Sequence, residues 1–129
     1  MIDAELPIGV FDSGMGGLTV LSALQTALPT ESFIYLGDSA RLPYGNKSAV
    51  TVQQYALQAS SALVDRGIKA LVVACNTASA AALPLLAQRY APLPVFGVIE
   101  PGAHAAATAA GDRSVLVLAT EGTVTVSYT

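Results

Sequence analysis

The chain has 129 residues, of which 53% are hydrophobic and 12% are charged, and its formal net charge is −3. This length suffices for a domain with a hydrophobic core, and the composition is not that of a disordered chain. The acidic balance of charge provides no basic face for nucleic acid or anionic lipid, so we expect neither nucleic acid nor a membrane as a partner. A small molecule is the expected ligand.

The amino end and the cysteine content predict the compartment. Met1–Glu5 lacks the basic start and apolar stretch of a signal peptide, and no apolar run approaches the roughly 18 residues of a membrane span. Cys75 is the only cysteine, so it cannot form an internal disulfide, and no paired Cys/His spacing indicates a zinc site. We therefore expect a cytoplasmic protein without a metal.

The first predicted unit is a strand at residues 8–11, a loop at residues 12–17 and a helix that begins at Leu18. Leucines recur at helical spacing along this helix until a proline at position 29 stops the pattern. Three glycines in four positions allow the loop to turn sharply and to approach a ligand closely. Asp12 and Ser13 place a carboxylate and a hydroxyl at its mouth.

The glycine loop does not match the nucleotide-binding patterns. Thr19 stands where a third glycine would be needed, and Met15 stands where a phosphate-binding loop needs lysine. The alternative to a ligand-binding loop is a tight turn that only caps the following helix.

The second predicted unit has a strand at residues 33–37 and a loop at residues 38–45, which is longer than most strand-to-helix connections. Long ordered loops are often functional. Ser48 is placed to cap a helix that ends near residue 67. Tyr44 in this loop is either the wall of a pocket or a packing ring, and both interpretations stay open.

The third predicted strand begins at Ala70 and leads into Cys75, after which a helix continues to about Tyr90, with Pro84 expected to bend or restart it. In open α/β sheets, ligands bind at the carboxyl ends of the strands. A thiol at this position faces the N–H groups of the next helix, which favour the thiolate. The alternative is a cysteine that serves only as a small buried hydrophobic residue.

The last predicted elements are a strand at 95–99, a helix at 101–110 and a fifth strand at 114–119. The alternation of strands and helices predicts an α/β fold, a parallel sheet with helices on both faces. Glu100 and His104 are expected to be solvent-exposed residues without a catalytic role.

Five segments, taken in order, resemble the bacterial glutamate racemases of the aspartate/glutamate racemase family. Three of them, residues 8–20, 35–45 and 73–79, resemble the signature blocks of that family, and residues 97–102 and 119–124 match two further stretches. The resemblance implies an isomerase that interconverts L- and D-glutamate without a cofactor, with the D-glutamate used for peptidoglycan in the bacterial cell wall.

The resemblance also implies the roles of particular residues. Cys75 is expected to be one of two catalytic cysteines, which act as acid and base on opposite faces of the substrate. Thr120 and Thr123 are expected to face the pocket, and no role passes to His104. The implied substrate-binding residues are Asp12, Ser13, Tyr44, Gly45, Asn76 and Thr77.

The family's second cysteine lies in a Cys-Thr-His block that the 129 residues do not contain, and residues 124–129 drift from the family sequence. We therefore expect a fragment that is inactive as a racemase by itself. Residues 1–97 would form the first lobe of a two-lobe fold, incomplete without a carboxyl-terminal return, and residues 98–129 would start the second lobe. A homodimer of the full-length enzyme stays open. The alternatives are another enzyme of the racemase group and a non-catalytic truncated binding module.

Overall fold

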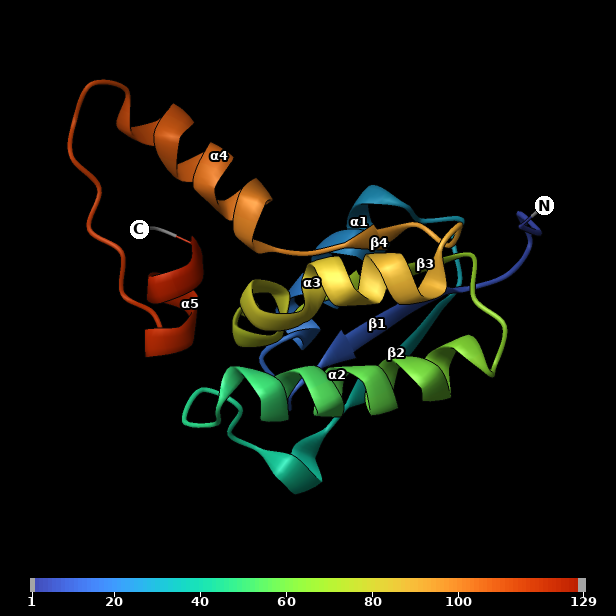
Figure 1. The fold of residues 1–129 in the computed structure, drawn as a ribbon. Helices are drawn as coiled ribbons and strands as arrows, with labels where there is room; N and C mark the ends of the chain where they lie inside the picture. Colours follow the sequence, from blue (N-terminus) through green and yellow to red (C-terminus); the bar gives the residue numbers. More distant parts are fainter. Residues whose placement is uncertain (1, 128–129) are drawn as a thin grey trace.

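The computed structural model of the chain describes residues 2–127, and its elements follow one another as strand and helix through the first hundred residues (Figure 1). Residues 1, 128 and 129, which belong to the two expected lobes, lie outside the described part. The elements are β1 (Ile8–Asp12), α1 (Leu18–Ala27), β2 (Phe33–Gly37), the 3-10 turn η1 (Ser39–Arg41), α2 (Ala49–Val64), β3 (Ala70–Val73), α3 (Asn76–Tyr90), β4 (Val95–Phe96), α4 (Ile99–Ala110) and α5 (Glu121–Ser127).

The four strands form one parallel sheet in the order β2-β1-β3-β4. Ile8 on the central strand β1 pairs with Phe33 on one side and with Ala70 on the other. Because the strands are parallel and in this register, β1, β2 and β3 end at the same edge of the sheet. The α/β fold with a parallel sheet is confirmed.

Helices cover both faces of the sheet. On one face, Val10 and Val72 pack against Leu21 and Leu24 of α1. On the other face, Phe11 and Val73 belong to a larger core with α2 and α3. Alternate residues of each strand therefore enter different cores, as expected for a sheet covered on both sides.

The helix ends follow the local sequence. The side chain of Ser48 caps α2 by accepting a hydrogen bond from the N–H of Thr51. The following helix, α3, continues to Tyr90 although Pro84 lies within it, so it does not restart at that proline.

The prediction of a fifth strand is wrong. Residues 114–119 have no regular structure, and Leu116 and Leu118 are 84% and 86% exposed. The apolar segment 115–118, in which valine alternates with leucine, favours a strand. A strand needs a partner, however, and no strand among the described residues pairs with this segment. The fourth strand is also shorter than predicted, because the chain enters α4 at Ile99.

The part of the chain after β4 lies largely outside the sheet. In Figure 1, α4 extends away from the helices of the sheet, and a long connection brings α5 back beside α3. Although α4 has alanine at half of its positions, none of its residues is buried. Among residues 2–127, no helix is both long and apolar enough to span a membrane.

An apolar groove remains beside α1, on the sheet face that α1 covers. Its volume is about 420 Å³, and nearly all of its lining is apolar. The residues that define it include Ile8, Val20, Leu24, Val72, Phe96 and Pro101. The helix α1 thus covers only part of this sheet face, and the part near β4 is left uncovered.

Candidate active site

The loop after β1 is closed by the carboxylate of Asp12. Its Oδ2 atom accepts hydrogen bonds from the N–H groups of Gly14, at 3.1 Å, and Gly17, at 2.9 Å. Asp12 is buried, so these bonds compensate for the water that its carboxylate loses. The predicted glycine loop is therefore a tight turn held by Asp12 at the start of α1.

A tyrosine from the neighbouring strand supports this loop. The hydroxyl of Tyr35 lies 2.9 Å from the carbonyl oxygen of Gly14 and 3.3 Å from Oδ2 of Asp12, and it donates to both acceptors. Burial, together with the charge of Asp12, raises the pKa of Tyr35 to about 12. The phenol therefore remains a hydrogen-bond donor at neutral pH.

Cys75 occupies the N-cap position of α3, at the end of the third strand. Its Sγ atom accepts a hydrogen bond from the N–H of Ala78 at 3.4 Å, and its thiol donates to Oγ of Ser13 at 3.5 Å. The thiol is buried, with 7% of the residue exposed. A nucleophilic atom thus lies at the amino end of a helix, within hydrogen-bond distance of a backbone N–H group.

The residues that follow Cys75 connect it to the end of the described chain. Asn76 is exposed, whereas Thr77 is buried and its Oγ1 lies 3.0 Å from Oγ1 of Thr120. The Thr120 hydroxyl in turn donates to Oγ1 of Thr123 at 3.1 Å. This chain of three hydroxyls holds α5 beside the amino end of α3.

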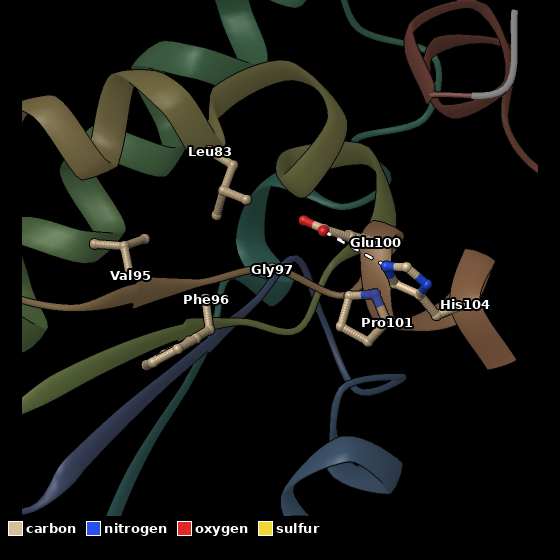
Figure 2. A pocket seen from close by; sticks show the side chains of 7 residues that line it. All are labelled: Leu83, Val95, Phe96, Gly97, Glu100, Pro101 and His104. Carbon is tan, nitrogen blue, oxygen red and sulfur yellow. Dashed lines mark ion pairs between the residues drawn. The ribbon is translucent and has the colours of Figure 1, made fainter.

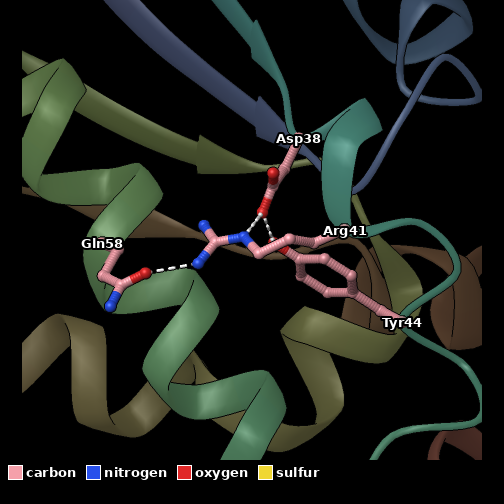
Figure 3. A network of polar contacts seen from close by, with 4 residues as sticks. All are labelled: Asp38, Arg41, Tyr44 and Gln58. Carbon is pink, nitrogen blue, oxygen red and sulfur yellow. Dashed lines mark hydrogen bonds and ion pairs between the residues drawn. The ribbon is translucent and has the colours of Figure 1, made fainter.

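Tyr44 is a packing ring rather than the wall of a pocket. Its ring is 1% exposed and packs between Phe11 and Tyr55, with centroid distances of 6.2 and 5.5 Å. Its hydroxyl donates to Asp38, and burial together with this bond raises the pKa of Tyr44 (Figure 3). The Tyr44 side chain therefore serves to hold the loop and is not free to contact a ligand.

Gly45 lies next to the hydroxyl chain. A Cβ atom at this glycine would stand 2.6 Å from Cγ2 of Thr120, so the loop after β2 approaches the start of α5 closely. The loops after β1, β2 and β3 therefore meet at one rim, and the chain preceding α5 closes one side of it.

A second pocket lies elsewhere, at the turn from β4 into α4 (Figure 2). It has a volume of about 300 Å³, and Glu100 and His104 lie at its edge with 3.6 Å between their Oε1 and Nε2 atoms. Both side chains are mostly exposed, as predicted. None of the site residues predicted from the sequence lines this pocket.

The structure brings Asp12, Ser13 and Cys75 together. Asn76 and Thr77 directly follow Cys75 as the first two residues of α3. Tyr35 was missed, because a tyrosine within a strand gives no sign that its hydroxyl reaches the neighbouring loop. Within residues 2–127, no group of three or more His, Cys, Asp or Glu side chains could hold a metal ion.

Comparison with known proteins identifies similar chains. The Asp/Glu/hydantoin racemase family model matches residues 8–129. The glutamate racemase of Geobacter metallireducens is 58% identical over 117 residues, which are 91% of this chain and 43% of that protein. The chain spans about half the length of the curated relatives that it matches.

Solved structures agree with this match. The glutamate racemase of Thermus thermophilus in complex with β-chloro-D-alanine is 54% identical and superposes with a TM-score of 0.84, covering 95% of this chain and 46% of that chain. The glutamate racemase of Francisella tularensis in complex with D-glutamate is 42% identical, with a TM-score of 0.85 over 96% of this chain and 46% of that one.

Proposed function

Because the chain belongs to the Asp/Glu/hydantoin racemase family, we propose that it forms the amino-terminal half of a glutamate racemase, an isomerase that interconverts L- and D-glutamate. The observation that carries this proposal is the position of Cys75. Its thiol caps α3 and contacts Ser13 at the edge where three parallel strands end.

In the proposed reaction, the thiolate of Cys75 removes the α-proton from one face of glutamate. The electron pair of the broken C–H bond passes into the α-carboxylate, and a second acid returns a proton to the opposite face. We assign the second acid to a cysteine of the longer enzyme, as the family resemblance implies. The two groups need no cofactor, because each supplies or accepts one proton.

The developing negative charge on the substrate carboxylate requires hydrogen-bond donors. We assign this role to the side chains of Ser13 and Asn76 and to the backbone N–H groups near Thr77 and Gly45, since the Thr77 hydroxyl already donates to Thr120. Asp12 contributes mainly by shaping the loop that carries Ser13, since its Oδ2 already accepts bonds from Gly14 and Gly17. Thr120 borders the same site through its bond to Thr77.

We also propose that residues 1–97 form a first lobe that another segment of the longer enzyme completes, and that residues 98–129 begin the second lobe. The apolar groove beside α1 supports this division, because its lining has almost no polar surface. The exposed apolar residues at 115–118 support it as well, since a strand partner from the second lobe would bury them.

In the cell, the proposed product is D-glutamate for peptidoglycan, made in the cytoplasm. The similarity to glutamate racemases at 54% and 58% identity supports glutamate over aspartate as the substrate. A homodimer of the longer enzyme is compatible with this proposal.

Alkylation of Cys75 tests whether glutamate occupies this site. Because Cys75 is the only cysteine, the rate of its reaction with iodoacetamide reports on one position. We expect D- or L-glutamate to slow the reaction, and aspartate, one methylene shorter, to have no effect. Protection by aspartate alone would favour another enzyme of the group. Equal rates with and without either amino acid would contradict glutamate binding by this chain.

A further inference from the structure

The loop after β2 is held by a single carboxylate (Figure 3). Asp38 follows the last residue of β2, and its Oδ2 atom accepts hydrogen bonds from Nε of Arg41, at 2.7 Å, and from the hydroxyl of Tyr44. The carboxylate is only 10% exposed, so both bonds are made to an acceptor that is largely removed from water. One side chain thereby fixes both the start and the end of the segment 38–44.

Arg41 connects this carboxylate to α2. Its guanidinium lies over the ring of Tyr55, 4.2 Å from the centroid, and donates through Nη1 to the side chain of Gln58. Tyr55 also packs against the ring of Tyr44. Figure 3 shows Arg41 between Asp38 and Gln58, so the guanidinium joins the loop to a helix that packs on the sheet.

This arrangement determines where Gly45 lies. Gly45 directly follows Tyr44, whose ring and hydroxyl are both fixed, and it packs closely against Thr120. Thr120 bonds to Thr77, two residues after Cys75. A displacement of the loop would therefore move Thr120 and, through its hydrogen bond, disturb Thr77 at the amino end of α3.

We infer that Arg41 is a positioning residue, which holds the Gly45 backbone at the substrate through Asp38, Tyr44 and Tyr55. The inference rests on the proposed function for the statement that this backbone meets glutamate. Arg41 itself does not contact the substrate, because its guanidinium is engaged by Asp38, Tyr55 and Gln58.

Lysine cannot replace arginine in this position. The planar guanidinium donates to Asp38 and to Gln58 from different nitrogens while its face lies on Tyr55. An ammonium group carries the same charge but lacks the planar fork and the flat face. Arg41→Lys therefore separates the geometry of the side chain from its charge.

The test compares Arg41→Lys with Arg66→Lys, a matched control at an exposed arginine that follows α2 and whose side chain donates to the Ala62 carbonyl of that helix. The first readout is hydrogen exchange of the Lys47 amide, which donates to the Tyr44 carbonyl at 3.0 Å. The second is the dissociation constant for glutamate from an NMR titration. For Arg41→Lys, we expect exchange and dissociation constant each to rise about tenfold, and no change for the control.

Gln58→Ala provides a second variant in case Arg41→Lys impairs folding, and we expect smaller changes in the same direction. Unchanged exchange at Lys47 in both variants would overturn the inference, and so would faster exchange with unchanged glutamate affinity. If the unaltered chain binds no glutamate, the proposed function is contradicted. The positioning role would still be supported or overturned by the exchange of the Lys47 amide.

Discussion

The thiol of Cys75 lies 3.5 Å from the hydroxyl oxygen of Ser13, although 62 positions separate them in the sequence. The contact arises because β1 and β3 are neighbours in the sheet and end at the same edge. In the neutral state the thiol donates to Ser13. Once the thiol is ionised, the direction reverses and the serine hydroxyl donates to the thiolate, which stabilises the charged form.

Replacement of this serine tests the contact. We expect Ser13→Ala to slow the alkylation of Cys75 by iodoacetamide about tenfold at neutral pH, because one charge-assisted hydrogen bond to the thiolate is lost. Ser22→Ala, on the exposed side of α1, is the control and should leave the rate unchanged. Equal rates for both variants would show that Ser13 does not stabilise the thiolate.

The backbone of Gly37, at the end of β2, lies close to the backbone of Gly14 in the loop after β1. A Cβ atom at this position would stand 2.3 Å from the carbonyl oxygen of Gly14, which is main chain and cannot rotate away. We expect Gly37→Ala to lower the free energy of unfolding by about 2 kcal/mol, measured by urea denaturation.

Gly102→Ala is the matched control for that variant. A Cβ at Gly102 meets nothing within 4 Å, and the residue lies inside α4. Because alanine favours a helix over glycine, we expect an unchanged or slightly higher stability, by up to about 1 kcal/mol. A similar loss in both variants would contradict the special packing of Gly37.

The hydroxyl chain from Thr77 to Thr123 predicts how α5 is attached. Thr120→Val keeps the shape of the side chain but removes the hydroxyl that bonds to both neighbours. We expect the Val124 amide, which donates to the Thr120 carbonyl, to exchange about fivefold faster with solvent. Thr108→Val on α4 should not change this rate, and an equal effect of the two variants would refute the attachment.

The raised pKa of Tyr35 predicts a loss of stability at high pH. The native pKa of about 12 lies above the ordinary tyrosine pKa of about 10, so the protonated phenol is favoured in the folded state. The contribution of the Tyr35 phenol to the free energy of unfolding is complete below about pH 10 and is lost as the pH rises through about 12. We expect the free energy of unfolding to fall less steeply over this range in Tyr35→Phe than in the unaltered chain.

Tyr55→Phe provides the control for that pH series, because it leaves the bonds of Tyr35 to Asp12 and Gly14 in place. It should reproduce the slope of the unaltered chain. The same slope in Tyr35→Phe would contradict a coupling between the Tyr35 proton and folding.

Much of the fold could be predicted because each unit has a strong local pattern. The strand at residues 33–37 is confirmed residue for residue, and the Ser48 cap is confirmed by its bond to Thr51. The predicted strand at 114–119 is wrong because strand formation depends on a partner, whereas local sequence reports only the preference of the segment.

The proximity of the candidate site residues was predictable where they lie at or just after strand ends, as Asp12, Ser13 and Cys75 do. It was not predictable where a side chain reaches across the sheet. The alternatives for Tyr44 were left open by the sequence, because only the packing of Phe11 and Tyr55 shows that its ring is buried. The bond of Arg41 to Gln58 joins residues 17 positions apart on different elements, which no local pattern indicates.

The central claim is that Cys75 acts as a base on one face of glutamate. Proton NMR in deuterated buffer tests it most directly, with L- and D-glutamate examined separately in the presence of this chain and of Cys75→Ser. A thiolate that removes the α-proton and returns a deuteron to the same face gives exchange without inversion. We expect loss of the α-proton signal for one enantiomer only, and none with Cys75→Ser. Exchange that persists in Cys75→Ser, or no exchange with a folded chain that binds glutamate, would contradict the claim.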